Sequence, residues 1–115
     1  MPYKRGDVAL VLFPDSNLRT AKRRPALVIQ ADNLDTSLRQ TIVAMITSNK
    51  SRANHPSRVT PLLNSPQGRR AHILMDSVVM TDNLATVFEN EIDRVLGDLD
   101  EMSEVEAALR HTLAL

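Results

Sequence analysis

The strongest constraint on the fold is a series of short apolar runs, each interrupted by proline or by polar residues. Residues 8–13 form one such run, which Pro14 closes, and similar runs occupy residues 26–29 and 41–47. Short apolar segments rich in β-branched residues are typical of buried β-strands. The run at residues 41–47 shows no polar alternation, which predicts a strand in the interior of a sheet.

The second half of the chain adds further strand-like segments. Residues 58–63 contain Pro61, and a proline inside a strand indicates a sheet edge or a bulge because it cannot donate to the ladder. The structure of residues 92–96 is ambiguous from the sequence, and Gly97 is expected to end that segment. Two more strands are predicted at residues 71–80 and 84–88.

One helix is predicted close to the C-terminal end. Ser103 and Glu106 have the spacing of a capping box, and Asp100 is an alternative cap for a slightly longer helix. The apolar residues of this segment repeat on one helical face: Val105, Ala108, Leu109, Thr112 and Leu113. Several short strands followed by one helix predict a mostly β, α+β fold, a small β-barrel or roll, in a single domain spanning residues 1–115.

The charge is distributed very unevenly, although the formal net charge is zero. Residues 1–75 carry twelve lysines and arginines and four acidic residues, a balance of +8. Residues 76–115 carry two arginines and ten acidic residues, a balance of −8. Such asymmetry indicates a polyanionic partner for the basic part. On charge alone, an ordinary solvated surface explains the pattern equally well.

Several kinds of site and location are not indicated by the sequence. There is no cysteine, and His55, His72 and His111 lie far apart, so no metal ion or other cofactor is expected. No apolar run is long enough to span a bilayer, and residues 1–7 lack the pattern of a signal peptide. The expected location is the cytoplasm, without membrane attachment.

Two polar loops concentrate the positive charge. Residues 14–24 are predicted to form the first basic loop, in which four of the last six residues are cationic, and residues 48–57 form the second. Pro25 disfavours a helical conformation for the residue before it and leads into the next predicted strand. Because the chain has only one tyrosine and two phenylalanines for stacking, contacts to a nucleic acid would come from guanidinium groups, hydroxyls and backbone amides.

Six segments, in order along nearly the whole chain, resemble the MazF/PemK toxins of bacterial toxin–antitoxin systems: KRGDVALVLFP, RRPALVIQ, IVAMITSN, SVVMTDNLATV, RVLGDL and ALRHTLAL. Each segment alone is weakly diagnostic, but the ordered set is specific. The resemblance implies a compact SH3-like or CcdB-like β-barrel with a C-terminal α-helix, usually assembled as a homodimer.

The activity implied by this resemblance is sequence-selective cleavage of single-stranded RNA, commonly mRNA, without a metal ion. Toxins of this family are neutralised by a cognate antitoxin whose flexible acidic segment lies over the RNA-binding surface. One alternative is a non-enzymatic toxin of the same fold that poisons a protein target such as DNA gyrase, as CcdB does. A catalytically inactive RNA-binding barrel is a third possibility.

The catalytic candidates come from the same resemblance. The functional arginine of the family precedes the proline of the second strand and matches Arg24, and its functional threonine ends the third strand and matches Thr47. An arginine can bind two phosphate oxygens at once, and a threonine hydroxyl can donate to the same phosphate. Asp76 stands where some relatives carry a catalytic aspartate, but those relatives have an arginine two residues earlier, where this chain has Leu74.

The candidate RNA-binding residues lie in the two basic loops: Arg19, Lys22, Arg23, Ser48, Asn49, Lys50 and Arg52. Relatives usually have glycines in the first of these loops, whereas residues 14–24 contain none. A stiffer loop and a different sequence preference are therefore expected for this chain.

Overall fold

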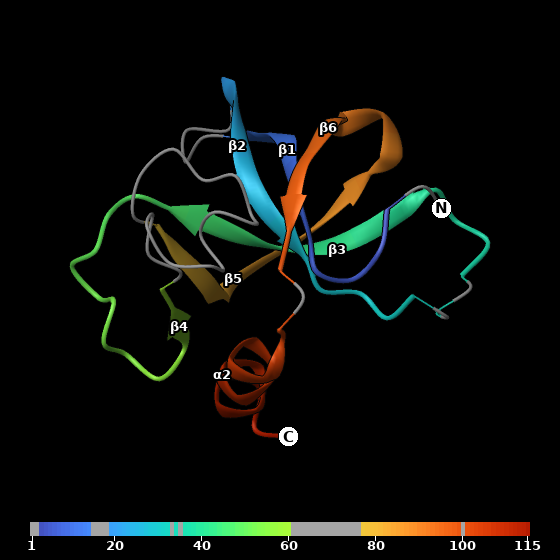
Figure 1. Cartoon of the computed structure of the whole chain (residues 1–115). Helices are drawn as coiled ribbons and strands as arrows, with labels where there is room; N and C mark the ends of the chain where they lie inside the picture. Colours follow the sequence, from blue (N-terminus) through green and yellow to red (C-terminus); the bar gives the residue numbers. More distant parts are fainter. Residues whose placement is uncertain (1–2, 15–18, 33, 35, 61–76, 100) are drawn as a thin grey trace.

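A computed structural model describes residues 3–14, 19–32, 34, 36–60, 77–99 and 101–115. Within these residues the chain forms a six-stranded antiparallel sheet, in the order β4-β5-β3-β2-β1-β6, and a C-terminal helix (Figure 1). The elements are β1 (Asp7–Pro14), β2 (Ala21–Val28), β3 (Gln40–Thr47), β4 (Arg58–Val59), β5 (Val78–Phe88), the short 3-10 helix η1 (Glu89–Glu91), β6 (Ile92–Asp98) and α2 (Ser103–Leu113).

The predicted fold class, a mostly β, α+β domain with a C-terminal helix, is confirmed. Closure into a barrel is not found in the part of the chain that the structure describes, where β4 pairs with β5 and β6 pairs with β1 at the two ends of the sheet. The β1–β6 ladder shifts register twice and the β3–β5 ladder once. Such irregularities increase the local twist, so the sheet bends without the pairing that would close it.

The centre of the sheet is buried on both faces. The helix face carries Val8, Leu27, Ala44 and Val79, which share a core cluster with Met102 and Val105 at the start of α2. The opposite face, called the far face below, is formed around Ala9, Val11, Ala26, Val28, Val43 and Met45. Because neighbouring residues of a strand point to opposite faces, a strand buried on both sides must be continuously apolar. The prediction that residues 41–47 form an interior strand is confirmed by β3, which lies between β5 and β2.

Strand β2 begins earlier than the sequence predicted. Its predicted start was residue 26, but the strand begins at Ala21, so the end of the first basic loop is extended strand. This added half pairs with the outer half of β1, with Arg24 opposite Val11. Backbone pairing in a hairpin tolerates charged side chains that remain in solvent, and three exposed cations occupy this half: Lys22, Arg23 and Arg24.

The two strands predicted at residues 71–80 and 84–88 are replaced by the single strand β5, described from Val78 onwards. Residues 71–76 lie outside the described residues. A shift of register in the β3–β5 ladder leaves three residues of β5 without a counterpart on β3: Thr81, Asp82 and Asn83. The polar residues that separated the two predicted strands are thus accommodated in a bulge, which does not end the strand.

The remaining strand predictions are met in part. Of residues 58–63, Arg58 and Val59 form β4 at one end of the sheet, which agrees with the predicted edge position. Pro61 lies outside the described residues. The ambiguous segment at residues 92–96 is a strand, and Gly97 does not end it, because Gly97 pairs with Val8 of β1.

The predicted capping box of α2 is wrong. The N-cap residue is Met102, without a side-chain cap hydrogen bond, and Ser103 is already helical. The Ser103 N–H donates to the carboxylate of Glu101 at 2.9 Å, so a preceding acid takes the role expected of the serine hydroxyl. The predicted apolar face is buried only in its first half, since Leu113 is 50% exposed. No helix among the described residues is long and apolar enough to cross a membrane.

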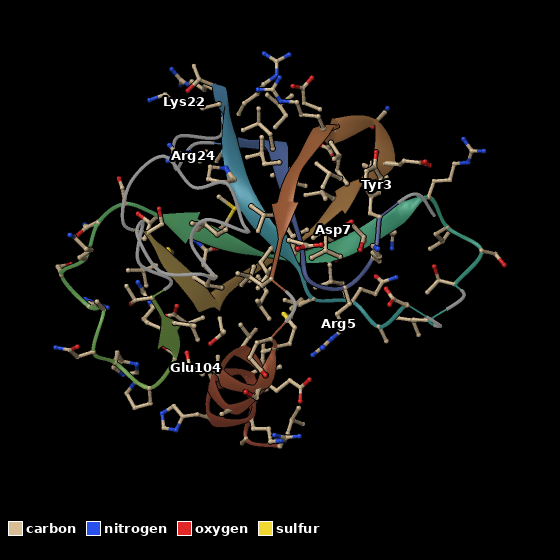
Figure 2. All side chains as sticks on the ribbon, in the orientation of Figure 1. Tyr3, Arg5, Asp7, Lys22, Arg24 and Glu104 are labelled. Atoms are coloured by element: carbon tan, nitrogen blue, oxygen red, sulfur yellow. The ribbon has the colours of Figure 1, made fainter. Side chains whose placement is uncertain are left out.

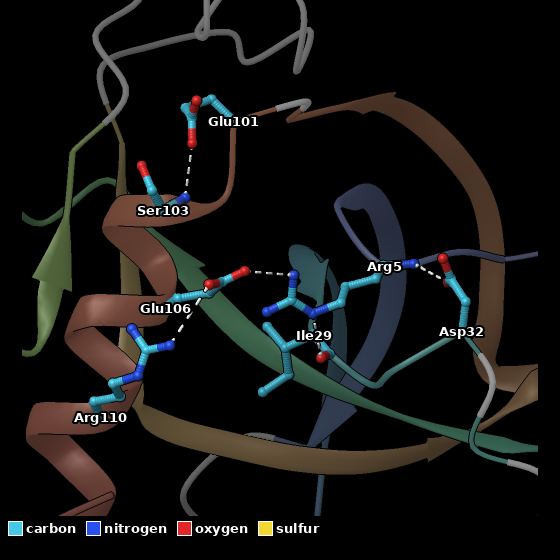
Figure 3. Close-up of polar contacts among 7 residues, drawn as sticks. All are labelled: Arg5, Ile29, Asp32, Glu101, Ser103, Glu106 and Arg110. Carbon is cyan, nitrogen blue, oxygen red and sulfur yellow. Dashed lines mark hydrogen bonds and ion pairs between the residues drawn. The ribbon is translucent and has the colours of Figure 1, made fainter.

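Arg5 joins the N-terminal segment to two other parts of the chain (Figure 3). Its backbone N–H donates to Asp32 Oδ1 at 2.7 Å, and its side-chain Nε donates to the Ile29 carbonyl at 3.3 Å. Its Nη1 donates to Glu106 Oε1 of α2 at 3.1 Å. Each partly exposed contact is weak alone, but together they fix the N-terminal segment against α2 and the connection after β2.

Gly6 lies where three segments approach closely. Its N–H donates to the Val28 carbonyl at 2.8 Å, and its carbonyl accepts the Leu99 N–H at 2.8 Å. Its φ is +96°, and a Cβ at this position would lie 2.6 Å from the Leu99 carbonyl oxygen. The backbone conformation and the close contact both require glycine.

We expect Gly6→Ala to lower the free energy of unfolding by roughly 2–4 kcal/mol, because alanine is strained at this φ and its methyl group overlaps the neighbouring backbone. Denaturant titration followed by circular dichroism measures the change. Gly97→Ala is the control, since Gly6 is the glycine with a positive φ among the described residues. An equal loss of stability in both variants would contradict this account.

Candidate active site

Arg24 and Thr47 lie at the same end of two paired strands. Strands β2 and β3 are antiparallel, with Ala26 opposite Met45. Arg24 precedes Ala26 by two residues and Thr47 follows Met45 by two, so both lie equally far beyond that pair. Side chains two residues apart on a strand leave the same face of the sheet. Arg24 and Thr47 therefore both project from the far face, which carries Ala26 and Met45.

The three consecutive cations of β2 do not share one face. Lys22 and Arg24 lie on the far face with Thr47, because residues alternate along a strand. Arg23 lies on the helix face, opposite Leu12 of β1. Figure 2 shows Lys22 and Arg24 towards one end of β2, remote from α2. Of the two candidate RNA-binding residues next to Arg24 in sequence, the structure thus places Lys22, but not Arg23, on the same face as Arg24 and Thr47.

The hydroxyl of Thr47 is oriented by the turn that follows it. The N–H of Asn49 donates to Thr47 Oγ1 at 3.1 Å, so the oxygen acts as an acceptor in that bond. The proton of the hydroxyl remains available for another acceptor, and a phosphate oxygen fits this role. Thr47 is half-buried, whereas Arg24 is exposed. The site therefore pairs a restrained neutral donor with an exposed cation.

The second basic loop follows Thr47 directly and presents the remaining predicted RNA-binding residues, all exposed: Ser48, Asn49, Lys50 and Arg52. The loop is folded by successive local hydrogen bonds. The Ser51 N–H donates to Asn49 Oδ1 at 3.0 Å, and the Ala53 N–H donates to the Lys50 carbonyl at 3.1 Å. Polar groups in this loop are therefore held in a defined order next to the candidate catalytic pair.

Of the two remaining candidate residues, the structure describes Arg19 but not Asp76. Arg19 is exposed and precedes β2 by two residues. Asp76 and Leu74 lie outside the described residues, so the position of the predicted aspartate relative to Arg24 and Thr47 is not described. Among the residues that the structure describes, no group of three or more His, Asp or Glu side chains is arranged to bind a metal ion.

One contact beside the site was not predicted. Arg58 Nη2 donates to Asp82 Oδ2 at 3.1 Å. Arg58 Nε lies 2.9 Å from Asp82 Oδ1 but is not aligned for a hydrogen bond. The Arg58 side chain is only 11% exposed, whereas Asp82 is 37% exposed, so the arginine side of this pair is shielded from water and the carboxylate side is not. The available sequence signal was the polar TDN within an otherwise apolar strand.

Comparison with known proteins shows the family of this chain. The family of PemK-like, MazF-like toxins of type II toxin–antitoxin systems matches residues 4–113 of the chain. The chain belongs to this family. The resemblance of the six sequence segments to MazF/PemK toxins is thereby confirmed.

Curated relatives in the MazF/PemK family cover nearly the whole chain. The chain is 35% identical over 107 residues to the endoribonuclease MazF6 of Mycobacterium tuberculosis (strain H37Rv), with 90% of each protein covered. It is 31% identical over 118 residues to the endoribonuclease EndoA of Bacillus subtilis (strain 168), covering all of this chain and 97% of the relative.

Solved MazF structures share the fold. An endoribonuclease in complex with its cognate antitoxin, from a mycobacterial species, has a TM-score of 0.73 at 21% identity and covers 98% of this chain and 96% of its own. A MazE–MazF crystal structure from Deinococcus radiodurans has a TM-score of 0.73 at 18% identity. The match covers 100% of this chain and 98% of the solved chain. The arrangement of strands and helix described above is therefore that of MazF toxins.

Proposed function

We propose that this MazF/PemK family member is a cytoplasmic, metal-independent endoribonuclease toxin that cleaves single-stranded RNA, commonly mRNA, at short sequences. The observation that carries the proposal is the location of Arg24 and Thr47 on one face, at the same end of β2 and β3. The curated relatives are named endoribonucleases, which supports RNA cleavage over the poisoning of a protein target such as gyrase.

The chemistry that suits these groups uses the 2′-hydroxyl of the substrate as the nucleophile. This hydroxyl loses its proton and attacks the adjacent phosphorus, so that the P–O2′ bond forms while the P–O5′ bond breaks. The products are a 2′,3′-cyclic phosphate and a 5′-hydroxyl, which receives a proton. Extra negative charge develops on the non-bridging phosphate oxygens in the transition state, and preorganised donors stabilise it.

In this mechanism each candidate residue has one role. Arg24 binds two phosphate oxygens through its planar guanidinium and remains charged throughout. The Thr47 hydroxyl donates its free proton to the same phosphate, since its oxygen already accepts from Asn49. Asp76 is the candidate acceptor for the proton of the 2′-hydroxyl.

The RNA strand on either side of the reacting phosphate would follow the exposed polar groups around Arg24 and Thr47. Lys22 extends the cationic side along β2, and Arg19 lies just before that strand. On the β3 side the contacts come from the second basic loop: Ser48, Asn49, Lys50 and Arg52. Hydroxyl, amide and cationic groups can bind phosphates and base edges, as a chain with few aromatic side chains requires.

The direct test is to incubate the purified protein with a long single-stranded RNA in excess EDTA. We expect discrete fragments that end in a cyclic phosphate, and the same pattern with and without EDTA. Retention of intact RNA would indicate a catalytically inactive RNA-binding protein. Neither cleavage nor binding would favour a toxin that acts on a protein target. Loss of cleavage in EDTA alone would refute the metal-independent mechanism.

We infer that the active form is a homodimer and that a cognate antitoxin neutralises it with a flexible acidic segment. The mycobacterial endoribonuclease of the same fold was solved in complex with its cognate antitoxin. On this chain the cations around Arg24 provide an electrostatic target for such a segment, and RNA needs the same cations. The antitoxin segment and RNA should therefore compete for binding.

We expect Lys22→Glu to slow the association of both a short single-stranded RNA and an acidic antitoxin peptide by about tenfold, because charge complementarity steers encounter. Stopped-flow fluorescence with labelled ligands measures the rates. The difference from wild type should shrink as salt is added, since salt screens exposed charges.

Arg23→Glu is the matched control for this experiment. It makes the same change in charge at the neighbouring residue, but on the opposite face of β2. At an ionic strength of about 0.15 M the screening length is about 8 Å, so a charge on the other face has a smaller effect. Equal slowing by the two variants would show that the ligands do not distinguish the two faces.

A further inference from the structure

The bulge of β5 lies beside the second basic loop. The shift in the β3–β5 register removes three residues from the ladder: Thr81, Asp82 and Asn83. The neighbouring β4–β5 ladder pairs Arg58 with Met80, and the Thr81 N–H donates to the Ser57 carbonyl at 3.1 Å. The bulge thus faces the last residue of the loop and the first residue of β4. Bulges are specific features that re-aim side chains, often next to active sites.

Thr81 connects this loop to α2 through one buried hydroxyl. Its side chain is fully buried, and its Oγ1 donates to the Ser57 carbonyl at 2.5 Å. Because that bond uses the only hydroxyl proton of Thr81, the Thr112 hydroxyl of α2 is the donor in their 2.8 Å contact. The Ser57 carbonyl thus accepts two hydrogen bonds from Thr81, one from its backbone N–H and one from its hydroxyl.

Ser57 is held from the loop side as well. It is 3% exposed, and its N–H donates to His55 Nδ1 at 3.1 Å. Since this ring nitrogen is an acceptor, the Ser57 hydroxyl donates to it across 2.8 Å. Ser57 thus uses its N–H, its hydroxyl and its carbonyl in defined contacts, and its position follows closely from the position of Thr81.

The residue after Ser57 also contacts the bulge, through the residue after Thr81. Arg58, whose side chain is largely buried, contacts Asp82 through the ion pair described above. At its other end the loop directly follows Thr47, whose hydroxyl accepts the Asn49 N–H. The exposed residues of the loop therefore lie between Thr47 at one end and a two-residue attachment to the β5 bulge at the other.

We propose that the β5 bulge is an anchor for the second basic loop and that Thr81 is a positioning residue for RNA recognition. This proposal rests on the proposed function, because it assigns RNA binding to that loop. Thr81 does not touch the RNA; it acts through Ser57 on the conformation in which the loop meets the RNA. A loop held in its binding conformation loses less entropy on binding, so the anchor strengthens RNA binding and sharpens its selectivity.

The kinetic test compares Thr81→Val with wild type on a short single-stranded RNA. Valine keeps the shape of the side chain and leaves the Thr81 N–H bond to Ser57 intact, so only the hydroxyl contacts are lost. We expect KM to rise about tenfold while kcat at saturating RNA stays within about twofold, because Arg24 and Thr47 are unchanged. Cleavage should also spread to sequences that wild type leaves intact.

Two further variants separate positioning from general structure. Thr81→Ser retains the hydroxyl and should restore KM to within about threefold of wild type. Thr112→Val removes the contact to α2 but keeps the Thr81–Ser57 bond, and it should leave KM unchanged. A loss confined to kcat in Thr81→Val, or a serine variant as defective as the valine variant, would overturn the proposal.

A second measurement does not depend on activity. In the RNA-free protein, the Ala53 and His55 amides donate to the Lys50 and Arg52 carbonyls within the loop, both at 3.1 Å. Their hydrogen exchange should be about tenfold faster in Thr81→Val, since the anchor stabilises the closed loop. If wild type does not cleave RNA, the proposed function fails, and the exchange rates still decide whether the bulge anchors the loop.

Asp82→Asn keeps the test decisive if Thr81→Val does not fold. Asp82 is 37% exposed, and asparagine preserves its shape while removing the charge that faces Arg58. The same rise in KM and in exchange of the loop amides is expected. Unchanged exchange in a folded variant of either residue would overturn the proposed anchor.

Discussion

Replacing Arg24 with alanine is expected to lower the rate of RNA cleavage by about 10²–10³-fold, which is the usual cost of removing one preorganised donor to a developing negative charge. Arg24 is exposed on β2, so its truncation leaves no cavity in the core and the protein should remain folded. Single-turnover cleavage of a short RNA at saturating enzyme measures the chemical step directly. The loss should appear there as well as in kcat/KM, because the interaction strengthens in the transition state.

Arg23→Ala is the control for that experiment. It removes the same side chain from the adjacent residue, which is also exposed but projects from the helix face. We expect its single-turnover rate to remain within about threefold of wild type, since a cation on the other face cannot contact the reacting phosphate. Similar losses in the two variants would remove Arg24 from its assigned role, and so would near-normal cleavage by Arg24→Ala.

A substrate with a 2′-deoxy sugar at the cleavage site is expected not to be cleaved at all. The proposed reaction has no other nucleophile, because the 2′-hydroxyl oxygen forms the new bond to phosphorus. Binding should persist, since the contacts proposed for Arg24, Lys22 and the second basic loop are to phosphates and base edges, which the substitution leaves unchanged. The deoxy substrate should therefore inhibit cleavage of the all-ribose RNA in competition.

The position of the substitution provides the control for this prediction. The same deoxy sugar placed two nucleotides from the cleavage site should leave cleavage close to normal. Full cleavage of the substrate with the deoxy sugar at the site would rule out attack by the 2′-hydroxyl. A hydrolytic water would then be required as the nucleophile, with a different assignment of the proton-transfer groups.

The number and type of elements followed largely from local sequence. The runs at residues 8–13 and 41–47 predicted β1 and β3 to within one residue at each end. β3 and the first part of β1, around Val8, Ala9 and Val11, are buried on two faces, and such segments have continuous apolar sequences that are easily recognised. The C-terminal helix was recognisable for a similar reason, since its first half carries an apolar stripe that packs on the helix face.

Errors in the sequence predictions arose where pairing between distant segments outweighs local preference. Three cations indicate a loop, yet β2 includes them because the outer half of β1 pairs with that segment. The polar residues from Thr81 to Asn83 indicate a break, yet β5 continues through them because the ladder resumes on both sides of the bulge. Local sequence describes what a residue prefers, whereas these outcomes depend on a strand elsewhere in the chain.

For the candidate site, too, some features followed from local sequence and others depended on pairing between distant strands. Sequence alone proposed Arg24 and Thr47 as candidates, because the residues around each resemble family segments that have a fixed order along the chain. Only the tertiary structure decided that Lys22 joins them while Arg23 faces away, since this depends on how far β2 extends and on its pairing with β1. The contact of Thr81 with Ser57 joins residues 24 apart in sequence, and only the β4–β5 ladder brings them together. A side chain's chemistry is encoded at its own position, but its neighbours across a sheet are set by backbone pairing, which no single segment contains.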